Sequence, residues 1–225
     1  MDAVGLSESQ YMALFDLYST TDGVHWDWQL PYALNGNPWQ FDTPVDPCTN
    51  SWQGVTCGVT SGEYHVIDLT LDTLRLRGPI PSSICNLTDI RVLSLPDNYL
   101  VGTIPDCIGT LASLTKLELS SNQLTGSIPE SFRQLPQLEA LYVDSNACNG
   151  TLDLLCDFPS LQIVYTNNNH LTGTLPDCIG DLPLSILDIS TNHINGTIPS
   201  NLGNLTQLTI LFLSNLQLTG TIPSV

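Results

Sequence analysis

Basic residues are scarce in this chain. Five Lys and Arg residues stand against 22 Asp and Glu residues, which gives a formal net charge of −17. All five lie between positions 75 and 133, so residues 1–65 and 134–225 contain none. Nucleic-acid binding depends on neutralising phosphates with Lys and Arg, so this balance argues against a nucleic-acid partner. It disfavours anionic membrane surfaces for the same reason.

Several sequence signals are absent as well. The chain has no run of about 20 apolar residues, so we expect no direct membrane insertion in this segment. No basic start followed by an apolar stretch marks a signal peptide after Met1. Gly-x-Ser-x-Gly, His-Glu-x-x-His, a phosphate loop and Cys-x-x-Cys are also missing. We therefore expect no enzyme, no catalytic residue, no cofactor and no metal site.

What the chain does contain is a regular series of glycines spaced 23 or 24 residues apart. Each is followed two residues later by Ile or Leu. The series is Gly78, Gly102, Gly126, Gly150, Gly173, Gly196 and Gly220. A period of about 20–29 residues with phased leucines is typical of a solenoid in which each repeat forms one coil.

One repeat, residues 114–138, illustrates the expected coil. Its Leu-x-Leu segment alternates apolar and polar residues, which predicts a short strand with inward leucines. Asn122 follows at a turn, where its amide can bond backbone groups inside the coil. Gly126 and Pro129 favour an extended flank. The remaining residues are too few for a regular helix, so we expect 3₁₀ or irregular turns on the convex side.

Residues 114–129 match the Leu-x-x-Leu-x-Leu-x-x-Asn-x-Leu-x-Gly-x-Ile-Pro pattern, which resembles the plant-type leucine-rich repeat. This resemblance covers residues 66–225 and implies a right-handed curved superhelix with a parallel sheet on its concave face. The family includes receptor-like kinases, receptor-like proteins and polygalacturonase inhibitors, and similar secreted proteins occur in algae and protists. We expect seven repeats over 66–225, with an uncapped C-terminal end.

Residues 1–65 form the expected N-terminal cap. Asp46-Pro47-Cys48 and the segment from Trp52 to Cys57 resemble the cap of that family. Ser7 and Gln10 fit a capping box at the start of a helix. We expect the four tryptophans to cover the open end of the first coil; a carbohydrate-binding platform is the alternative.

Seven cysteines indicate an oxidising compartment. Cys48 and Cys57 bracket the cap motif. The pairs Cys85–Cys107 and Cys156–Cys178 are each 22 residues apart and would join neighbouring coils. Coils about 4.8 Å apart are compatible with disulfide geometry. This scheme leaves Cys148 unpaired at a core position; a Cys148–Cys156 bond is its main alternative.

Four sequons fit N-glycosylation, and all lie away from the concave strands: Asn86, Asn149, Asn195 and Asn204. Chance is the alternative, because the repeat is rich in Asn, Gly and Thr. His170 and His193 occupy the same position in adjacent repeats. Without a third ligand they indicate a solvated pair at the rim; a metal site or a pH sensor is the alternative.

The repeat frame also predicts which side chains line the concave face. The later repeats carry aromatic and apolar residues with polar neighbours, a combination that protein interfaces favour. We expect Tyr142, Tyr165, Asp188 and Phe212 at the centre of a binding face, with Ile163, Ile186, Asp144 and Asn167 beside them. The alternative is that β-branched and aromatic residues simply suit strands.

We interpret the chain as an extracellular recognition domain, secreted or part of a cell surface, that binds a protein, peptide or glycan on this face. One alternative is an inhibitor of a secreted polysaccharide-degrading enzyme. Another is a structural or adhesive glycoprotein of a cell surface, wall or filament, with self- or hetero-assembly through the C-terminal end. The sequence stops part-way through a repeat at Val225. We therefore expect the natural protein to continue, or this end to pack on something.

Overall fold

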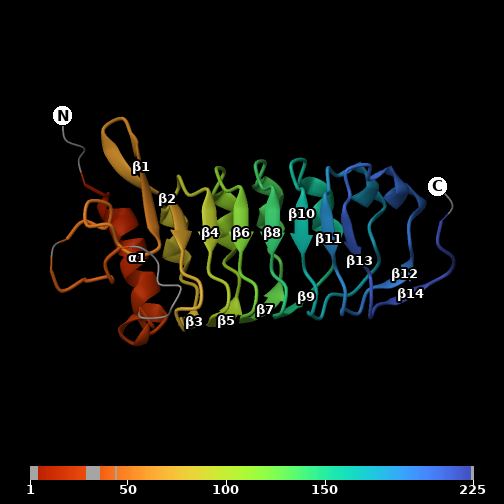
Figure 1. The fold of residues 1–225 in the computed structure, drawn as a ribbon, viewed down its shortest axis with the longest axis horizontal. Coiled ribbons are helices and arrows are strands. Elements are labelled where there is room, and N and C mark those ends of the chain that lie inside the picture. The colour runs from red at the N-terminus through yellow and green to blue at the C-terminus, as the bar shows by residue number, and fades with distance from the viewer. Residues whose placement is uncertain (1–4, 29–35, 44, 224–225) are drawn as a thin grey trace.

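The chain forms a solenoid in which each repeat is one coil. The computed structural model describes residues 5–28, 36–43 and 45–223. Its coils lie side by side along one axis, with the cap at one end and the last repeat at the other (Figure 1). The expected end at Val225 lies outside the described residues. None of the described helices is long and apolar enough to cross a bilayer.

The main sheet contains eight strands, and the order of its seven repeat strands follows the sequence. Leu93, Leu117 and Leu141 pair on neighbouring strands, as the repeat frame predicts. Strand β1 joins this sheet as an antiparallel hairpin with β2, so the expected boundary at residue 65 falls inside β2. The strands are β1 (Val55–Thr60), β2 (Glu63–Thr70), β4 (Val92–Ser94), β6 (Lys116–Glu118), β8 (Ala140–Tyr142), β10 (Ile163–Tyr165), β11 (Ile186–Asp188) and β13 (Ile210–Phe212).

The Gly-x-Ile-Pro flank is extended, as expected, and forms two further small parallel sheets. One contains β3 (Arg77–Pro79), β5 (Tyr99–Thr103), β7 (Gln123–Ser127) and β9 (Ala147–Asn149); the other contains β12 (Asn195–Thr197) and β14 (Gln217–Thr219). These sheets were not predicted.

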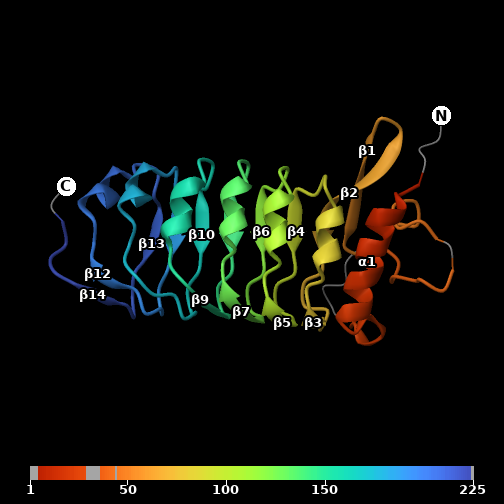
Figure 2. The same cartoon turned by 180° about the vertical axis from the view of Figure 1, so that it is seen from behind.

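Short 3₁₀ helices form the side opposite the main sheet, which confirms the predicted turn type (Figure 2). Each starts just after the flank segment of its repeat. They are η2 (Ser82–Asn86), η3 (Asp106–Thr110), η4 (Glu130–Gln134), η5 (Asp153–Asp157), η6 (Asp177–Asp181) and η7 (Ser200–Asn204).

A column of buried or half-buried asparagines bonds each coil to the next. Asn122 is typical: its Nδ2 donates to the carbonyls of Leu95, Leu119 and Ser120 at 2.9, 3.1 and 3.1 Å. Its Oδ1 accepts from the amide of Leu100 at 2.9 Å. The other members of this asparagine ladder are Asn98, Asn146, Asn169 and Asn192. Leucine, isoleucine, valine and phenylalanine fill the space between the sheets and the 3₁₀ helices.

The cap closes the first coil. Helix α1 (Glu8–Thr20) packs against η2 and β3, and its carboxyl end lies close to Gly78. A Cβ on Gly78 would lie 2.0 Å from the Thr20 carbonyl oxygen, so only glycine fits this contact. Trp26, Trp39 and Trp52 are buried in a cluster of aromatic rings, as expected for residues that cover an open coil end.

The start of α1 differs from a complete capping box. Ser7 Oγ does accept from the Gln10 amide, at 3.4 Å. The Gln10 side chain, however, turns away to β2, where its Oε1 accepts from the Val66 amide at 2.9 Å and its Nε2 lies 3.1 Å from His65 Nδ1. Gln10 is buried, so it fixes the cap helix to the first repeat strand instead of closing its own helix end.

The predicted disulfide scheme is confirmed. Cys48–Cys57, Cys85–Cys107 and Cys156–Cys178 are bonded, with Cα separations of 5.6, 6.0 and 5.6 Å. The second and third bonds join neighbouring 3₁₀ helices. Cys148 is a free, fully buried thiol, so the alternative Cys148–Cys156 bond is absent. Burial raises the pKa of this thiol to about 11, and it therefore stays neutral at physiological pH.

Replacing one ladder asparagine should destabilise the whole stack. Asn122→Ala removes four hydrogen bonds and leaves buried backbone groups unpaired. We expect a loss of about 2–4 kcal/mol, seen as a fall of about 4–12 °C in melting temperature. Gln123→Ala, at the exposed neighbouring position, should stay within about 0.5 kcal/mol of the wild type. Equal melting temperatures for the two variants would contradict this role.

Thiol labelling tests the cysteine scheme. Native protein should resist iodoacetamide at pH 8, because Cys148 is buried and its pKa lies near 11. After unfolding without reductant, about one equivalent should react, and peptide mapping should place it on Cys148. A label on Cys178 would instead show that Cys148 is bonded to Cys156.

Candidate functional site

The candidate site is the exposed face of the main sheet over its later strands. In each short strand the middle residue points into the core, so the residues on either side face solvent. Tyr142, Tyr165, Asp188 and Phe212 end four successive strands and lie in register. The repeat frame therefore brings these predicted residues together in one row. Whether the row binds a ligand stays a prediction.

Two tyrosines form the centre of this row. The rings of Tyr142 and Tyr165 stack with centroids 5.3 Å apart and planes 9° from parallel. Lys116 Nζ lies 5.4 Å from the Tyr142 ring centre, within cation–π range. Desolvation raises the pKa of Tyr142, which keeps its hydroxyl protonated as a hydrogen-bond donor. The result is a rigid, half-buried aromatic surface with polar tips.

A polar network lies beside the tyrosines over the earlier strands. The buried Ser94 hydroxyl is 3.1 Å from Asp72 Oδ1 and 3.1 Å from Glu118 Oε2. Lys116 Nζ pairs with Glu118 Oε2 at 2.6 Å. Burial is the main cause of a raised pKa at Asp72, which the Ser94 bond partly offsets and the charge of Glu118 increases. These groups bond mainly to each other.

Three predicted polar residues differ in their exposure and in their hydrogen bonds within the chain. Asp188 is only 8% exposed and accepts from the amide and hydroxyl of Ser190, at 3.0 and 2.6 Å. Asp144 accepts from the Ser120 hydroxyl at 2.5 Å and remains half-buried. Asn167 Oδ1 is buried and has no hydrogen-bond partner among the described residues. Asp188 thus has a structural bond, whereas Asn167 has an unused acceptor.

An apolar row runs parallel to the tyrosines. Ile163, Ile186 and Ile210 lie opposite each other on β10, β11 and β13, and all three are half-buried. Phe212 is 52% exposed at the last strand. These residues border Tyr165 and Asp188 and complete the predicted face.

The four sequon asparagines are exposed and lie off the main sheet. Asn86 and Asn204 end η2 and η7, while Asn149 and Asn195 lie in the flank strands β9 and β12. Glycans at these positions would leave the main sheet face open. Their occupancy stays a prediction.

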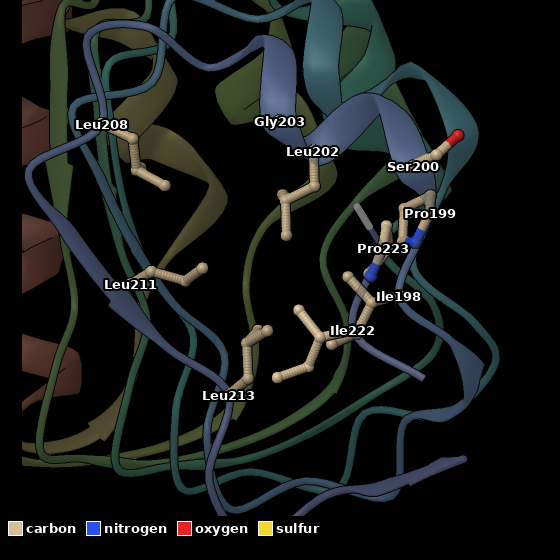
Figure 3. A pocket seen from close by; sticks show the side chains of 10 residues that line it. All are labelled: Ile198, Pro199, Ser200, Leu202, Gly203, Leu208, Leu211, Leu213, Ile222 and Pro223. Atoms are coloured by element: carbon tan, nitrogen blue, oxygen red, sulfur yellow. The ribbon is translucent and has the colours of Figure 1, made fainter. Parts of the chain in front are cut away.

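The last described coil contains an apolar pocket of about 350 Å³. Leu211 and Leu213 lie on one side of it, and Ile222 and Pro223 on the other (Figure 3). Leu211 is 38% and Ile222 is 86% exposed. Large apolar side chains therefore remain accessible at this end of the described solenoid.

The repeat frame predicted correctly which residues lie on the outer face of the main sheet. It did not predict the hydrogen bonds and ion pairs among them. The network of Lys116, Ser94 and Asp72 depends on side-chain lengths and rotamers across coils, which the repeat frame does not specify. One sequence feature could have indicated this network. Lys116 lies one coil before Tyr142, within the segment that contains all the Lys and Arg residues.

Comparison with known proteins identifies the repeats. The Leucine rich repeat family profile matches residues 88–147, and a second profile of the same description matches residues 160–182 and 183–205. The leucine-rich repeat receptor-like protein kinase PXC1 of Arabidopsis thaliana is 38% identical over 94 residues, which is 42% of this chain and 12% of that protein. The chain thus spans only a small part of this relative.

Solved structures extend the likeness to almost the whole chain. The structure titled PEPR1–AtPEP1 superimposes with a TM-score of 0.79 at 32% identity, over 96% of this chain and 29% of that one. The Arabidopsis receptor kinase HAESA, solved with the peptide hormone IDA and the co-receptor SERK1, gives a TM-score of 0.75 at 32% identity, over 93% and 34% of the two chains. Both comparisons confirm the predicted solenoid fold.

Asp72 should make stability depend on pH. Because its pKa is raised in the folded state, it favours folding at low pH, and this contribution is lost as pH rises through the folded pKa. Asp72→Asn should therefore raise the melting temperature at pH 7 by about 1–3 °C, with little difference near pH 3. Glu63→Gln, on the exposed β1–β2 hairpin, is the control. A lower melting temperature of Asp72→Asn at pH 7 would contradict the assignment.

Proposed function

Because the chain is built of leucine-rich repeats like those of plant receptor kinase ectodomains, we propose that it is an extracellular domain that binds a peptide on the main sheet face. The stacked Tyr142–Tyr165 pair is the observation that carries this proposal. Aromatic anchors with a polar rim are the usual centre of a protein interface. The three disulfides are consistent with an extracellular location.

The chemistry of the face favours a peptide with a basic side chain. Tyr142 already holds one cation, Lys116, over its ring. Asp144 lies just after the strand that ends at Tyr142, and its carboxylate is half-buried. Residues 134–225 contain no Lys or Arg, and the charge of Lys116 beside Tyr142 is offset by its ion pair with Glu118. The apolar row of Ile163, Ile186 and Ile210 would receive a neighbouring apolar side chain.

The solved neighbours support a peptide over the glycan or protein ligands that the sequence left open. HAESA is described with a peptide hormone and a co-receptor. The curated relatives are kinases, but their matches to this chain cover only the repeats. We assign binding and not catalysis to these residues.

A second candidate is assembly through the C-terminal end. The apolar pocket beside Leu211, Leu213 and Ile222 favours it, because accessible apolar surface of this kind commonly marks an interface. A second copy of the chain or another protein would then cover the last coil.

Loss of the tyrosine pair should weaken peptide binding. A peptide selected by phage display on the intact chain should bind the Tyr142→Ala/Tyr165→Ala variant at least about tenfold more weakly. The melting temperature should change little, since both rings are partly exposed. The matched control is Tyr99→Ala, an exposed tyrosine on the flank sheet, which should keep full affinity. Calorimetry measures all three, and unchanged affinity in the double variant would refute the site.

A further inference from the structure

Two histidines stack at the edge where the chain leaves the main sheet. The rings of His170 and His193 have centroids 5.9 Å apart and planes 10° from parallel. Both residues are exposed and line a pocket of about 390 Å³ that extends over three coils. Its other lining residues are Asn168, Asn169, Thr191, Asn192, Asn215, Leu216 and Gln217.

The register of the solenoid explains this pairing. Each histidine directly follows a ladder asparagine, so the two occupy the same place in neighbouring coils. Their amides donate to the coil before: His170 to the Cys148 carbonyl and His193 to the Leu171 carbonyl, both at 2.8 Å. The backbone therefore fixes the spacing of the two imidazoles.

The charge around this pair is unusual for the protein. His170 and His193 are the only side chains in residues 134–225 that can become cationic near neutral pH. None of the described lining residues carries a carboxylate. Cys148 meets the pair through its carbonyl, while its thiol is buried in the core.

The other two histidines are different. His25 lies 2.7 Å from Asp22, and His65 lies 3.1 Å from Asp89. Each thus has an internal anion available when it becomes protonated. Neither ring of the stacked pair forms an ion pair with a carboxylate among the described residues, so an anionic ligand would be the first to do so.

The ring geometry favours an anion over a metal ion. Nitrogen lone pairs lie in the ring plane, so parallel rings do not direct two of them at one metal at the required distance of about 2.0–2.1 Å. No group of three His, Cys, Asp or Glu residues able to hold a metal occurs in the described parts of the chain. Two protonated rings on adjacent coils instead place two positive charges side by side, which attract an oxyanion. The amides of Asn168, Asn215 and Gln217 add neutral donors.

We propose that the His170–His193 pocket is a pH-gated binding site for an oxyanion. Binding occurs when both imidazoles are protonated and weakens as they lose their charge. The bound group would be a carboxylate of the ligand, either an acidic side chain of a peptide or a uronic acid of a glycan. The pocket shares no lining residue with the tyrosine pair, so the two proposals can fail separately.

Calorimetry with sulfate tests the pocket, because sulfate keeps its charge between about pH 5.5 and 7.5 while histidine does not. Sulfate should bind at least about tenfold more tightly at the lower pH. His170→Gln/His193→Gln should remove this dependence. His170→Lys/His193→Lys, whose two charges persist, should keep binding at pH 7.5. His25→Gln, a remote exposed histidine, should behave as the wild type.

A second pair of probes separates the sources of the carboxylate. A short glutamate peptide and trigalacturonate should both bind only at low pH. Higher affinity for the peptide would identify the ligand as a peptide, and higher affinity for trigalacturonate would identify it as a glycan. Imidazole NMR signals of the wild type should shift on adding sulfate, which tests the site without a variant.

Three results would overturn the proposal. The first is sulfate binding that does not change with pH, and the second is sulfate binding that survives in the double Gln variant. The third is binding of Zn²⁺ at pH 7.5 that requires both histidines while sulfate has no effect, which would make the pocket a metal site.

Discussion

The hydrogen bonds that join each coil to the next determine the rest of this structure. Ladder asparagines such as Asn122 bond carbonyls of their own coil and of the preceding one, and they accept an amide from that preceding coil. Slipping by one residue would break these bonds and turn the inward leucines toward solvent. A fixed register makes residues 23 or 24 positions apart into neighbours. The disulfides between coils, the tyrosine stack and the histidine stack all follow from it.

A stack of this kind needs a closed end, and the cap supplies one with contacts that no repeat contains. Gln10 bonds the backbone of β2, and Gly78 lets the end of α1 approach the first flank strand. The buried indoles of Trp26 and Trp39 also donate to carbonyls of Thr21 and Gln53. Because Trp26, Trp39 and Trp52 are buried and two of them are also hydrogen-bonded, these rings serve packing better than they would serve a sugar.

Periodicity predicted the parts of the fold that repeat. The inward leucines, the asparagine turns, the 3₁₀ side and the cysteine pairs all follow from a 23–24-residue frame, since the frame states which residues share a position. It does not state which partner a side chain selects. For that reason the frame did not predict three contacts. These are the hydrogen bond between Asp188 and Ser190, the hydrogen bond from Ser94 to Asp72, and the bond of Gln10 to the Val66 amide in β2. The flank sheets also escaped prediction, because Gly and Pro are poor strand formers and only stacking brings those backbones together.

Some polar and aromatic side chains of the solenoid already have partners within the chain, whereas others do not. This difference indicates where on the solenoid a ligand would bind. Over β4 and β6, the charged residues Lys116, Glu118 and Asp72 bond mainly to each other, so a ligand there would have to displace existing bonds. Over β8 and β10, the two tyrosine rings are partly exposed, and the pocket around the histidine pair has no carboxylate among its described lining residues. Binding at these later coils costs fewer internal interactions. The residues without internal partners are therefore a better indication of a binding surface than the density of charge along the face.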